Sequence, residues 1–470
     1  MKTVAILGGS YGGARAATLL AQGLPHGWRV VLVDRNSHIN HLYVLPRYAV
    51  LPGHEHKAFI PYNNVFLPPR TGSTPGPLVH PAYTDPARSV LLHASVTSLA
   101  THTLTLDRAF PEHGVSEADR TLHFDYLIYA LGSHLPSPIN LWDPAAGDVE
   151  RAEVLDVARG TKGGGVAFLK QFQRRVSRAA SVLVVGGGAL GIQFASDIAE
   201  IYPATNVTLL HSRHRLLPRF DEAMHSEIVS SLSALNVCTI LGDRLDLASL
   251  ADNKHSNGER VVRTQSGREV QAELVLLCTG QTPNTWLLRD AFPQSVVADG
   301  PDKGLARVRR TLQLAEPVPE SGLPTAVVED ARTRIAASHI FAIGDAADAF
   351  GAVNAGHNAF FQGEVAARNV IRLIKQAERK QKAEPEDLEL EKYTPGAPAI
   401  KVSLGLTKSV YQYQGVIGTR DEEQDDLDIH IMWRYFGYEV ERGDLDTDRP
   451  DEEIPGAVPR LVYTTKEVTV

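Results

Sequence analysis

Residues 3–13 read TVAILGGSYGG, and residues 181–191 read SVLVVGGGALG. Each stretch is an apolar run that ends in a glycine-rich turn. Apolar residues at helical spacing follow each turn, and a second apolar run, such as WRVVLVD at 28–34, closes each unit. Strand, glycine turn, helix and strand in this order make a βαβ unit. The first glycines of the two turns, Gly8 and Gly186, lie 178 residues apart. This spacing predicts two nucleotide-binding folds in one chain rather than a solenoid of short repeats.

The length of 470 residues suits about three domains, and an apolar content of 43% is enough for a core in each. Only two cysteines occur, Cys238 and Cys278, and neither belongs to a CxxC motif or a His–Cys cluster. The sequence therefore predicts no disulfide scaffold, no dithiol redox motif and no metal site.

The sequence also lacks membrane signals. Its longest apolar runs, such as residues 274–278, are far shorter than the roughly 18 residues of a membrane span. A strand that begins near Thr3 leaves no room for a signal peptide, and Lys2 in place of glycine excludes N-terminal myristoylation. We expect a cytoplasmic protein without a transmembrane segment. Peripheral membrane contact through the aromatic residues 429–440 stays open, although packing of these residues on the nucleotide-binding domains is favoured.

The net charge of -8 is concentrated near the C-terminus. Residues 421–453 hold 14 Asp or Glu and three Arg, whereas the rest of the chain holds 41 acids and 44 bases. The run DEEQDDLD at 421–428 is typical of a solvated acidic loop. This distribution argues against a nucleic acid partner, because DNA binding needs a basic surface.

The first glycine turn, GGSYGG, has Gly8, Gly12 and Gly13 in place but Ser10 where a second key glycine is usual. Asp34 closes the following strand, 21 residues after Gly13. An acid at this position can accept hydrogen bonds from the ribose hydroxyls of an adenosine. The alternative is a tight turn with an unrelated surface aspartate.

The second turn, GGGALG, fits the GxGxxG pattern through Gly186, Gly188 and Gly191. His211 stands 20 residues later, where an acid would be expected, and the sequence continues with basic residues in LLHSRHR (209–215). A ribose 2′-phosphate would be repelled by an acid but attracted by Ser212, Arg213 and Arg215. The pattern favours a site that accepts NADPH; the alternative is that these residues are solvated and the site takes NADH.

Further motifs extend the pattern along the chain. They include VDRNSHINHLYVLPRYAV (33–50), KAFIPY (57–62), FDYLIYALGS (124–133), LCTGQTPNT (277–285), IFAIGDAAD (340–348) and YTPGAPAIKVSLG (393–405). In this order they resemble the two-dinucleotide flavoprotein oxidoreductases, and most closely their apoptosis-inducing-factor-like, ferroptosis-suppressor-like group. The chain departs from that pattern at Ser10, at Leu131 for threonine, at Gln193 for glutamate, and in the Pro- and Gly-rich excursion at 62–88.

The resemblance implies FAD in the first site and NADPH or NADH in the second. It implies an α/β fold with two Rossmann-like domains and a smaller C-terminal α+β region. The FAD domain would span 1–150 and 286–378, the NAD(P)H domain 151–285, and the linker with the C-terminal region 379–470. It implies FAD contacts at Gly8, Gly9, Ser10, Gly12, Gly13 and Asp34, with Arg47 near the pyrophosphate, the main chain of Val96 near the adenine, and Asp345 at the ribityl hydroxyls.

The resemblance also implies electron transfer to a quinone or another small aromatic acceptor. Flavin and nicotinamide carry the chemistry of hydride transfer, so we assign no catalytic acid, base or nucleophile. The helix expected from about Asn354 would direct its N-terminus at the flavin. His357 in its first turn is either structural or a hydrogen-bond partner of flavin or acceptor. Two alternative functions stay open: a tailoring enzyme of a biosynthetic pathway, and a signalling or DNA-binding flavoprotein gated by redox state.

Overall fold

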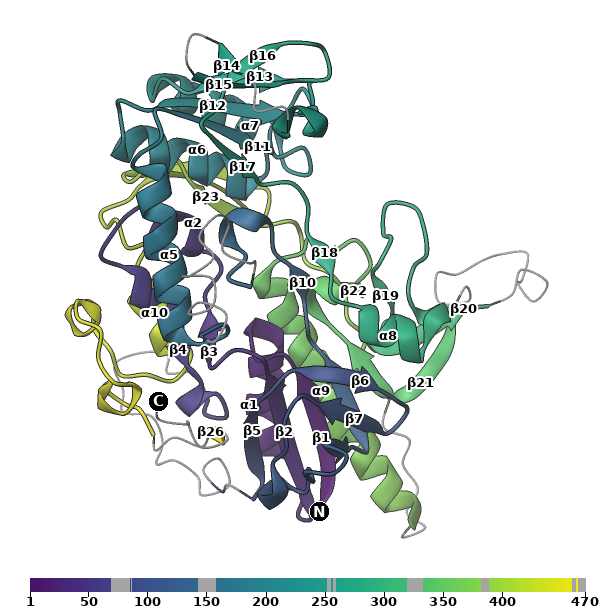
Figure 1. Ribbon diagram of the computed structural model, residues 1–470. Helices are drawn as coiled ribbons and strands as arrows, with labels where there is room; N and C mark the ends of the chain where they lie inside the picture. Colours follow the sequence, from purple (N-terminus) through teal and green to yellow (C-terminus); the bar gives the residue numbers. More distant parts are fainter. Residues whose placement is uncertain are drawn as a thin grey trace.

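The computed structural model of the protein describes residues 1–68, 85, 87–142, 158–251, 255–256, 259–318, 333–381, 389–458 and 462–463. The larger sheet has seven strands in the order β20-β21-β9-β1-β2-β5-β26 (Figure 1). All neighbouring pairs are parallel except β20 with β21. The strands are β1 (Lys2–Leu7), β2 (Trp28–Asp34), β5 (Ser89–His93), β9 (Tyr126–Tyr129), β20 (Gln313–Pro317), β21 (Thr333–Ala342) and β26 (Val462–Tyr463).

A second, four-stranded parallel sheet lies at the other end of the molecule (Figure 1). The chain enters it after β9 and later returns to the first sheet with β20 and β21, so the first domain is interrupted by the second. This architecture confirms the predicted fold class. In the order β13-β12-β11-β17, the strands are β13 (Cys238–Leu241), β12 (Asn206–His211), β11 (Ser181–Val185) and β17 (Leu274–Leu277). Its helices are α5 (Lys162–Val176), α6 (Ala189–Ile201) and α7 (Glu222–Ala234).

Smaller elements complete the two domains. β10 (Ser133–His134) pairs antiparallel with β18 (Thr282–Pro283), which joins the two segments that connect the domains. The predicted boundary at 150 lies outside the described residues, and the one at 378 falls in the last turns of α9 (Gly356–Gln381). The remaining elements are β3 (His38–Asn40), α2 (Leu45–Tyr48), β4 (Phe59–Pro61), β6 (Val96–Leu99), β7 (Thr103–Leu106), β8 (Thr121–His123), β14 (His255–Ser256), β15 (Glu259–Arg263), β16 (Glu269–Gln271), α8 (Trp286–Ala291), β19 (Ala306–Arg307) and β22 (Ala347–Asp348).

Small residues let helix α1 (Tyr11–Gly23) cross α9 at close range (Figure 1). A Cβ atom on Gly12 would lie 2.5 Å from the carbonyl oxygen of Ala359, and one on Gly363 would lie 2.3 Å from the carbonyl oxygen of Gly12. Real Cβ atoms do not approach main-chain oxygens this closely. The crossing therefore depends on glycine, and it brings the N-terminus of α9 beside the first glycine turn.

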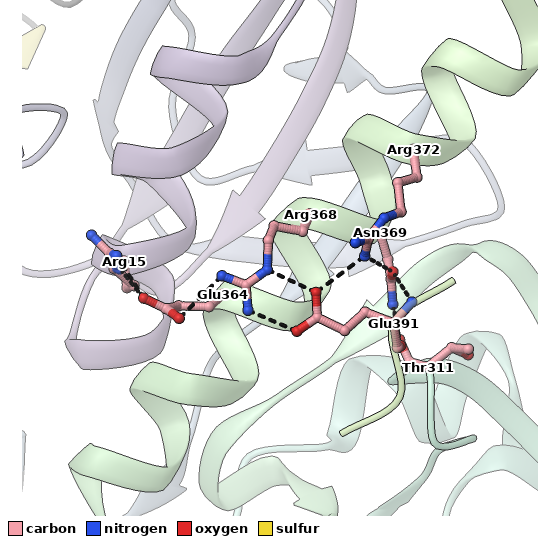
Figure 2. A network of polar contacts seen from close by, with 7 residues as sticks. All are labelled: Arg15, Thr311, Glu364, Arg368, Asn369, Arg372 and Glu391. Atoms are coloured by element: carbon pink, nitrogen blue, oxygen red, sulfur yellow. Dashed lines mark hydrogen bonds and ion pairs between the residues drawn. The ribbon is translucent and has the colours of Figure 1, made fainter. Parts of the chain in front are cut away.

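A chain of charged side chains fixes the segment before the C-terminal region (Figure 2). Glu364 on α9 accepts a hydrogen bond from Nε of Arg15 on α1 at 2.8 Å and pairs with Arg368 at 3.1 Å. Arg368 also donates to both carboxylate oxygens of Glu391, each at 2.8 Å. The buried side chain of Asn369 brackets the main chain of Glu391, donating to its carbonyl at 2.8 Å and accepting from its N–H at 2.7 Å. The network ties residue 391 to both helices.

The C-terminal region is a three-stranded antiparallel sheet followed by a short helix. Its first strand packs on α6 and its second on α7. Trp433 donates its indole N–H to the carbonyl of Lys57 at 2.9 Å, and Tyr438 donates to the carbonyl of Pro61 at 3.0 Å. The predicted packing of residues 429–440 on the nucleotide-binding domains is confirmed. The elements are β23 (Ile400–Ser403), β24 (Lys408–Tyr413), β25 (Val416–Asp421) and α10 (Ile429–Tyr435).

The acidic run at 421–428 is only in part the solvated loop that its sequence predicts: Asp421, Glu423 and Asp425 are exposed, but two acids are buried. Glu422 is 8% exposed and Asp426 is 2% exposed. Asp426 lies 3.6 Å from the ammonium group of Lys57 and also pairs with Arg442, while Glu422 pairs with Lys401 at 2.6 Å. These bases lie elsewhere in the chain, so the local composition could not show that the acids have partners. The prediction was wrong for Glu422 and Asp426 because their pairing is tertiary.

Among the described helices, none combines the length and the apolar character needed to cross a membrane. The same residues contain no group of three or more His, Cys, Asp or Glu side chains arranged to hold a metal ion.

Candidate functional site

The first glycine turn joins β1 to α1 in a geometry that only glycine allows. Gly8 has φ +92°, and a Cβ atom on Gly13 would lie 1.8 Å from the carbonyl oxygen of Gly8. Ser10 is the N-cap residue of α1, yet its side chain makes no capping hydrogen bond, and the first turn holds no acid. The first N–H groups of a helix have no partner within it and carry its positive dipole end. The turn is therefore suited to an anion such as a pyrophosphate.

Asp34 lies beside this turn, as the sequence predicts. Its Oδ2 accepts a hydrogen bond from the N–H of Gly9 at 2.6 Å, and its Oδ1 accepts one from the N–H of Asn36 at 2.7 Å. The side chain is 6% exposed. Each carboxylate oxygen has a second lone pair, so the fixed carboxylate can still accept hydrogen bonds from ribose hydroxyls.

The second turn repeats this geometry between β11 and α6. Gly186 has φ +126°, and a Cβ atom on Gly191 would lie 1.9 Å from the carbonyl oxygen of Gly186. Gly188 is the N-cap residue of α6, whose first turn holds no acid. His211 accepts a hydrogen bond at Nδ1 from the N–H of Gly187 at 3.0 Å. Both turns are therefore built for a dinucleotide, with histidine in the place of the aspartate.

His211 is an uncharged group at neutral pH. Burial, followed by the charge of Arg213, lowers the pKa of His211 below its ordinary value, and Arg244 lowers it further, while the main chain of Arg215 partly offsets these effects. Because Nδ1 accepts the bond from Gly187, the proton of the neutral ring resides on Nε2. The side chain thus places no negative charge beside a bound nucleotide.

The basic residues around His211 differ from the predicted set. Arg213 is exposed, as a phosphate ligand requires, but Arg215 is bound to its own loop through the carbonyls of Pro218 at 2.9 Å and Phe220 at 3.0 Å. Arg244, which follows β13, is exposed beside His211 and was missed by sequence reasoning. Arg244 follows β13, which pairs in parallel with β12, and the carboxyl ends of parallel strands meet at one edge of a sheet. This position at the end of a strand was the signal in the sequence that could have identified Arg244. Within the described residues, neither Arg213 nor Arg244 has an ion-pair partner.

Asp345 lies at the start of a short turn between β21 and β22. Ser133 donates to its carboxylate at 3.3 Å, and burial raises the pKa of Asp345, an effect that this hydrogen bond partly opposes. A small pocket beside Asp345 is lined by residues that precede and begin α9, including Asn354, Asn358 and Gln362. Its position between the turn that carries Asp345 and the start of α9 is compatible with the predicted ribityl contact.

Three aromatic rings gather at the N-terminus of α9, and sequence reasoning did not find them. Tyr11 has φ +22°, and its hydroxyl accepts the N–H of Leu42 and contacts Nδ1 of His41, both at 3.1 Å. Tyr43 accepts the N–H of Gly356, the first residue of α9, at 2.7 Å. This N–H belongs to the helix end that was expected to face the flavin. His357 lies in the same turn, and burial lowers the pKa of its ring.

Arg47 and Val96, the other two predicted FAD contacts, lie in different surroundings. Arg47 is 1% exposed; its Nε donates to Asp197 on α6 at 2.9 Å, and its other donors reach the carbonyls of Gly405 at 2.6 Å and Asp425 at 2.9 Å. Through these partners Arg47 connects the two domains and the C-terminal region. Its contact with the pyrophosphate stays a prediction. Val96 begins β6, close after the strand that pairs with β2 at Asp34.

The residues around the first turn fit FAD by three features: a glycine cradle that admits no Cβ atom, an uncapped helix N-terminus, and a fixed buried carboxylate. The second turn fits a nicotinamide dinucleotide by the first two features.

Comparison with known proteins agrees with this geometry. The family model for the pyridine nucleotide-disulphide oxidoreductases matches residues 2–298. Fe-regulated protein 8 of Mycosarcoma maydis is 41% identical over 438 residues, which cover 93% of this chain and 95% of that protein. Ferroptosis suppressor protein 1 of Homo sapiens is 26% identical over 441 residues, covering 92% of this chain and 95% of that protein.

A solved structure of an engineered water-forming NADPH oxidase bound to NADPH shares the fold, with a TM-score of 0.53 and 16% identity over 87% of this chain and 74% of that one. The chain thus belongs to the pyridine nucleotide-disulphide oxidoreductase family, as an apoptosis-inducing-factor-like, FAD-dependent NAD(P)H oxidoreductase.

Proposed function

We propose that this enzyme oxidises NADPH or NADH at the second turn and passes the electrons from FAD, held at the first turn, directly to a small quinone-like acceptor. The placement of its two cysteines carries the proposal. Cys238 begins β13 and Cys278 follows β17, and these strands form opposite edges of the second sheet. Both thiols are free, and burial raises the pKa of Cys278, which keeps it a protonated, unreactive thiol. No dithiol relay can connect flavin and acceptor.

FAD would supply the hydride-accepting and electron-donating chemistry between the two substrates. The protein would hold its pyrophosphate at Gly8, Gly9, Ser10, Gly12 and Gly13, its ribose at Asp34, and its ribityl chain near Asp345. The α9 N-terminus would provide a positive dipole end near the isoalloxazine. These assignments rest on the glycine turn, the carboxylates of Asp34 and Asp345, and the small pocket described above.

The second turn favours NADPH over NADH in this proposal. Its elements Gly186, Gly188 and Gly191 would hold the pyrophosphate of either nucleotide. A 2′-phosphate would find the exposed guanidinium groups of Arg213 and Arg244 and the uncharged ring of His211, with no acid in the place of Asp34. In the engineered NADPH oxidase, one aspartate is replaced by alanine and two arginines are introduced. That design follows the same electrostatic logic.

We propose that a planar acceptor approaches the flavin beside a small hollow with partly aromatic walls, which would have to widen to admit it. The hollow lies between α1, residues 64–67, α9 and α10, and its walls include Tyr11, Phe360, Tyr435 and Phe436. Tyr11 also contacts Gly356 at the N-terminus of α9, so the pocket adjoins the end of the helix that would face the flavin. Aromatic side chains bind flat rings through stacked or edge-to-face contacts.

The experiment is a steady-state acceptor panel with the purified protein and a Cys238→Ser/Cys278→Ser variant. We expect rapid NADPH oxidation with menadione and a short-chain ubiquinone, little activity with a disulfide acceptor, and the same quinone activity in the variant. Loss of quinone activity in a folded variant would show that a thiol takes part and would overturn direct transfer. The described residues offer no specific observation in favour of either alternative function.

A further inference from the structure

Three polar side chains lie along one face of helix α6. Gln193, Asp197 and Glu200 are spaced by four and then three residues, so they point to the same side of the helix. Asp197 is 0% exposed, and the other two side chains are half-buried. The helix packs on β23 of the C-terminal region and on α2 of the first domain (Figure 1). A polar stripe on the buried side of a helix needs partners from other segments.

Residues 403–406, which we call the strap, supply partners for both ends of this stripe. The side-chain amide of Gln193 donates to the hydroxyl of Ser403 at 3.1 Å. The carboxylate of Glu200 accepts the N–H of Leu406 at 2.7 Å. The strap therefore follows α6 for about two helical turns and is bonded to it at each end.

Arg47 on α2 completes the contact from the first domain. Its side chain is 1% exposed, and its Nε donates to Asp197, the middle residue of the stripe, at 2.9 Å. A second guanidinium nitrogen donates to the carbonyl of Gly405 in the strap at 2.6 Å, and the third donates to the carbonyl of Asp425 at 2.9 Å. One side chain thus joins the first domain, the second domain and the C-terminal region.

The buried ion pair of Arg47 and Asp197 fixes geometry more than it adds stability. Taking two charges out of water costs about as much as their attraction gains, so apolar residues of similar size are often equally stable in such places. An apolar pair gives no direction, however, whereas a planar guanidinium holds its acceptors at set angles. The pair therefore determines where α6 lies relative to the first domain.

The position of α6 matters because the second glycine turn is its N-terminus. Gly188 is the N-cap residue, and Asp197 lies nine residues further along, which is about 13 Å at a rise of about 1.5 Å per residue. A displacement of α6 at Asp197 therefore moves the turn and any nucleotide bound there. Hydride transfer requires the reacting atoms at about 3–3.5 Å, and a misplacement of about 1 Å can slow a reaction by about a hundredfold.

We propose that Arg47 is a positioning residue for hydride transfer. Acting through Asp197 and the strap, it holds the second turn at the distance from the first domain at which the nicotinamide reaches the flavin. The inference rests on the proposed function, in which FAD lies at the first turn and the nicotinamide nucleotide at the second. It also gives the C-terminal region a part in the reaction, because the strap carries one of the acceptors of Arg47.

The test measures the two half-reactions of the holoenzyme separately by anaerobic stopped-flow spectroscopy. At saturating NADPH, Arg47→Ala and Asp197→Ala should each reduce the flavin about tenfold or more slowly. The NADPH concentration at half-saturation should change little, because Arg213 and Arg244 stay in place. Reoxidation of the reduced flavin by menadione should keep its wild-type rate, since the second turn takes no part in it. Arg47→Lys keeps the charge beside Asp197 without the guanidinium fork, so it should recover part of the reduction rate.

Two further variants separate positioning from stability. Arg47→Met/Asp197→Leu replaces the pair by apolar residues and should be more stable in urea than Arg47→Ala, yet its flavin reduction should stay slow. Lys408→Ala is the matched control: it removes a contact of the C-terminal sheet with Glu227 on α7, a helix that does not begin at the glycine turn. It should reduce the flavin at the wild-type rate. Independently of turnover, hydrogen exchange of the strap amides should accelerate in Arg47→Ala.

Wild-type flavin reduction in folded Arg47→Ala and Asp197→Ala, or in the double variant, would overturn the inference. Equal slowing of both half-reactions would also overturn it, and so would loss of flavin from the Arg47 variants alone, which would place Arg47 at the pyrophosphate. The proposed function fails by a different result, namely a wild-type flavin that NADPH does not reduce or that menadione does not reoxidise.

Discussion

Asp34 and His211 accept the same hydrogen bond in the two halves of the molecule, each from the N–H of the second glycine in its turn, at 2.6 Å and 3.0 Å. The two halves therefore share the position of this side chain and its hydrogen bond to the glycine turn, but the side chain is an acid in the first half and a neutral imidazole in the second. An acid favours a ribose with free hydroxyls, whereas a neutral imidazole between two arginines tolerates a 2′-phosphate.

The first prediction exchanges this charge. His211→Asp should keep the hydrogen bond from Gly187 but place an anion beside the 2′-phosphate. We expect kcat/KM for NADPH to fall by about tenfold or more, since like charges at close range repel, while kcat/KM for NADH holds or rises. Steady-state kinetics with both nucleotides measure the ratio. An unchanged ratio would contradict the role assigned to His211.

The second prediction concerns the two exposed arginines. Arg213→Ala and Arg244→Ala should each raise KM for NADPH by about tenfold, the loss of one charge-assisted hydrogen bond, and change KM for NADH little. Arg215→Ala is the control, because its guanidinium holds the loop at Pro218 and Phe220. It should affect both nucleotides alike. A selective NADPH defect in Arg215→Ala, with none in Arg244→Ala, would show that the phosphate lies elsewhere.

The third prediction tests the buried pair between Arg47 and Asp197, which are 1% and 0% exposed. Arg47→Ala leaves Asp197 charged and buried without its partner, so the free energy of unfolding should fall by about 3–5 kcal/mol. Arg334→Ala is the comparison: its pair with Glu316 measures 2.6 Å but is exposed on the arginine side, and its loss should cost less than about 1 kcal/mol. Urea unfolding measures both, and similar losses would contradict the structural part given to Arg47.

The fourth prediction is a dependence of stability on pH that arises from His41. Burial lowers the pKa of His41 from 6.5 to about 3 in the folded protein. Unfolding therefore takes up a proton in this interval: the stability contributed by the neutral ring is complete above pH 6.5 and is lost as the pH falls towards 3. His41 should contribute about 1.4 kcal/mol per pH unit to the slope, in addition to the contributions of other histidines whose pKa values burial also lowers.

Urea unfolding at several pH values between about 5 and 6.5 measures this slope. His41→Gln should reduce the slope by about 1.4 kcal/mol per pH unit. His26→Gln, at an exposed position, should leave the slope unchanged. The same slope in wild type and His41→Gln would assign the dependence to another group.

Local features of the sequence were sufficient for the two turns. Gly8, Gly13, Gly186 and Gly191 lie within single strand–turn–helix units, so their spacing already determines where the main chain can bend. The same holds for Asp34, which ends the strand next to its turn. These residues are found where the pattern predicts them because the whole unit is short and self-contained.

Features that depend on tertiary contacts could not be read from the sequence. Arg244 reaches the second site from the end of a separate strand, and no spacing in the sequence links it to a glycine turn. The burial of Glu422 and Asp426 depends on bases contributed by other segments. Arg215 was predicted as a phosphate ligand because it is a base in the right stretch of sequence. In the structure its guanidinium donates to carbonyl groups of its own loop.

The central claim is that hydride enters from the second turn and electrons leave directly from flavin bound at the first. Anaerobic stopped-flow spectroscopy tests it most directly: the yellow holoenzyme is mixed with NADPH or NADH, and the reduced protein is then mixed with menadione. The account predicts rapid bleaching of the flavin band by the nucleotide, faster with NADPH at low concentration, and full return of the band on mixing with the quinone. A protein that carries no flavin, or a flavin that neither nucleotide reduces, would contradict it.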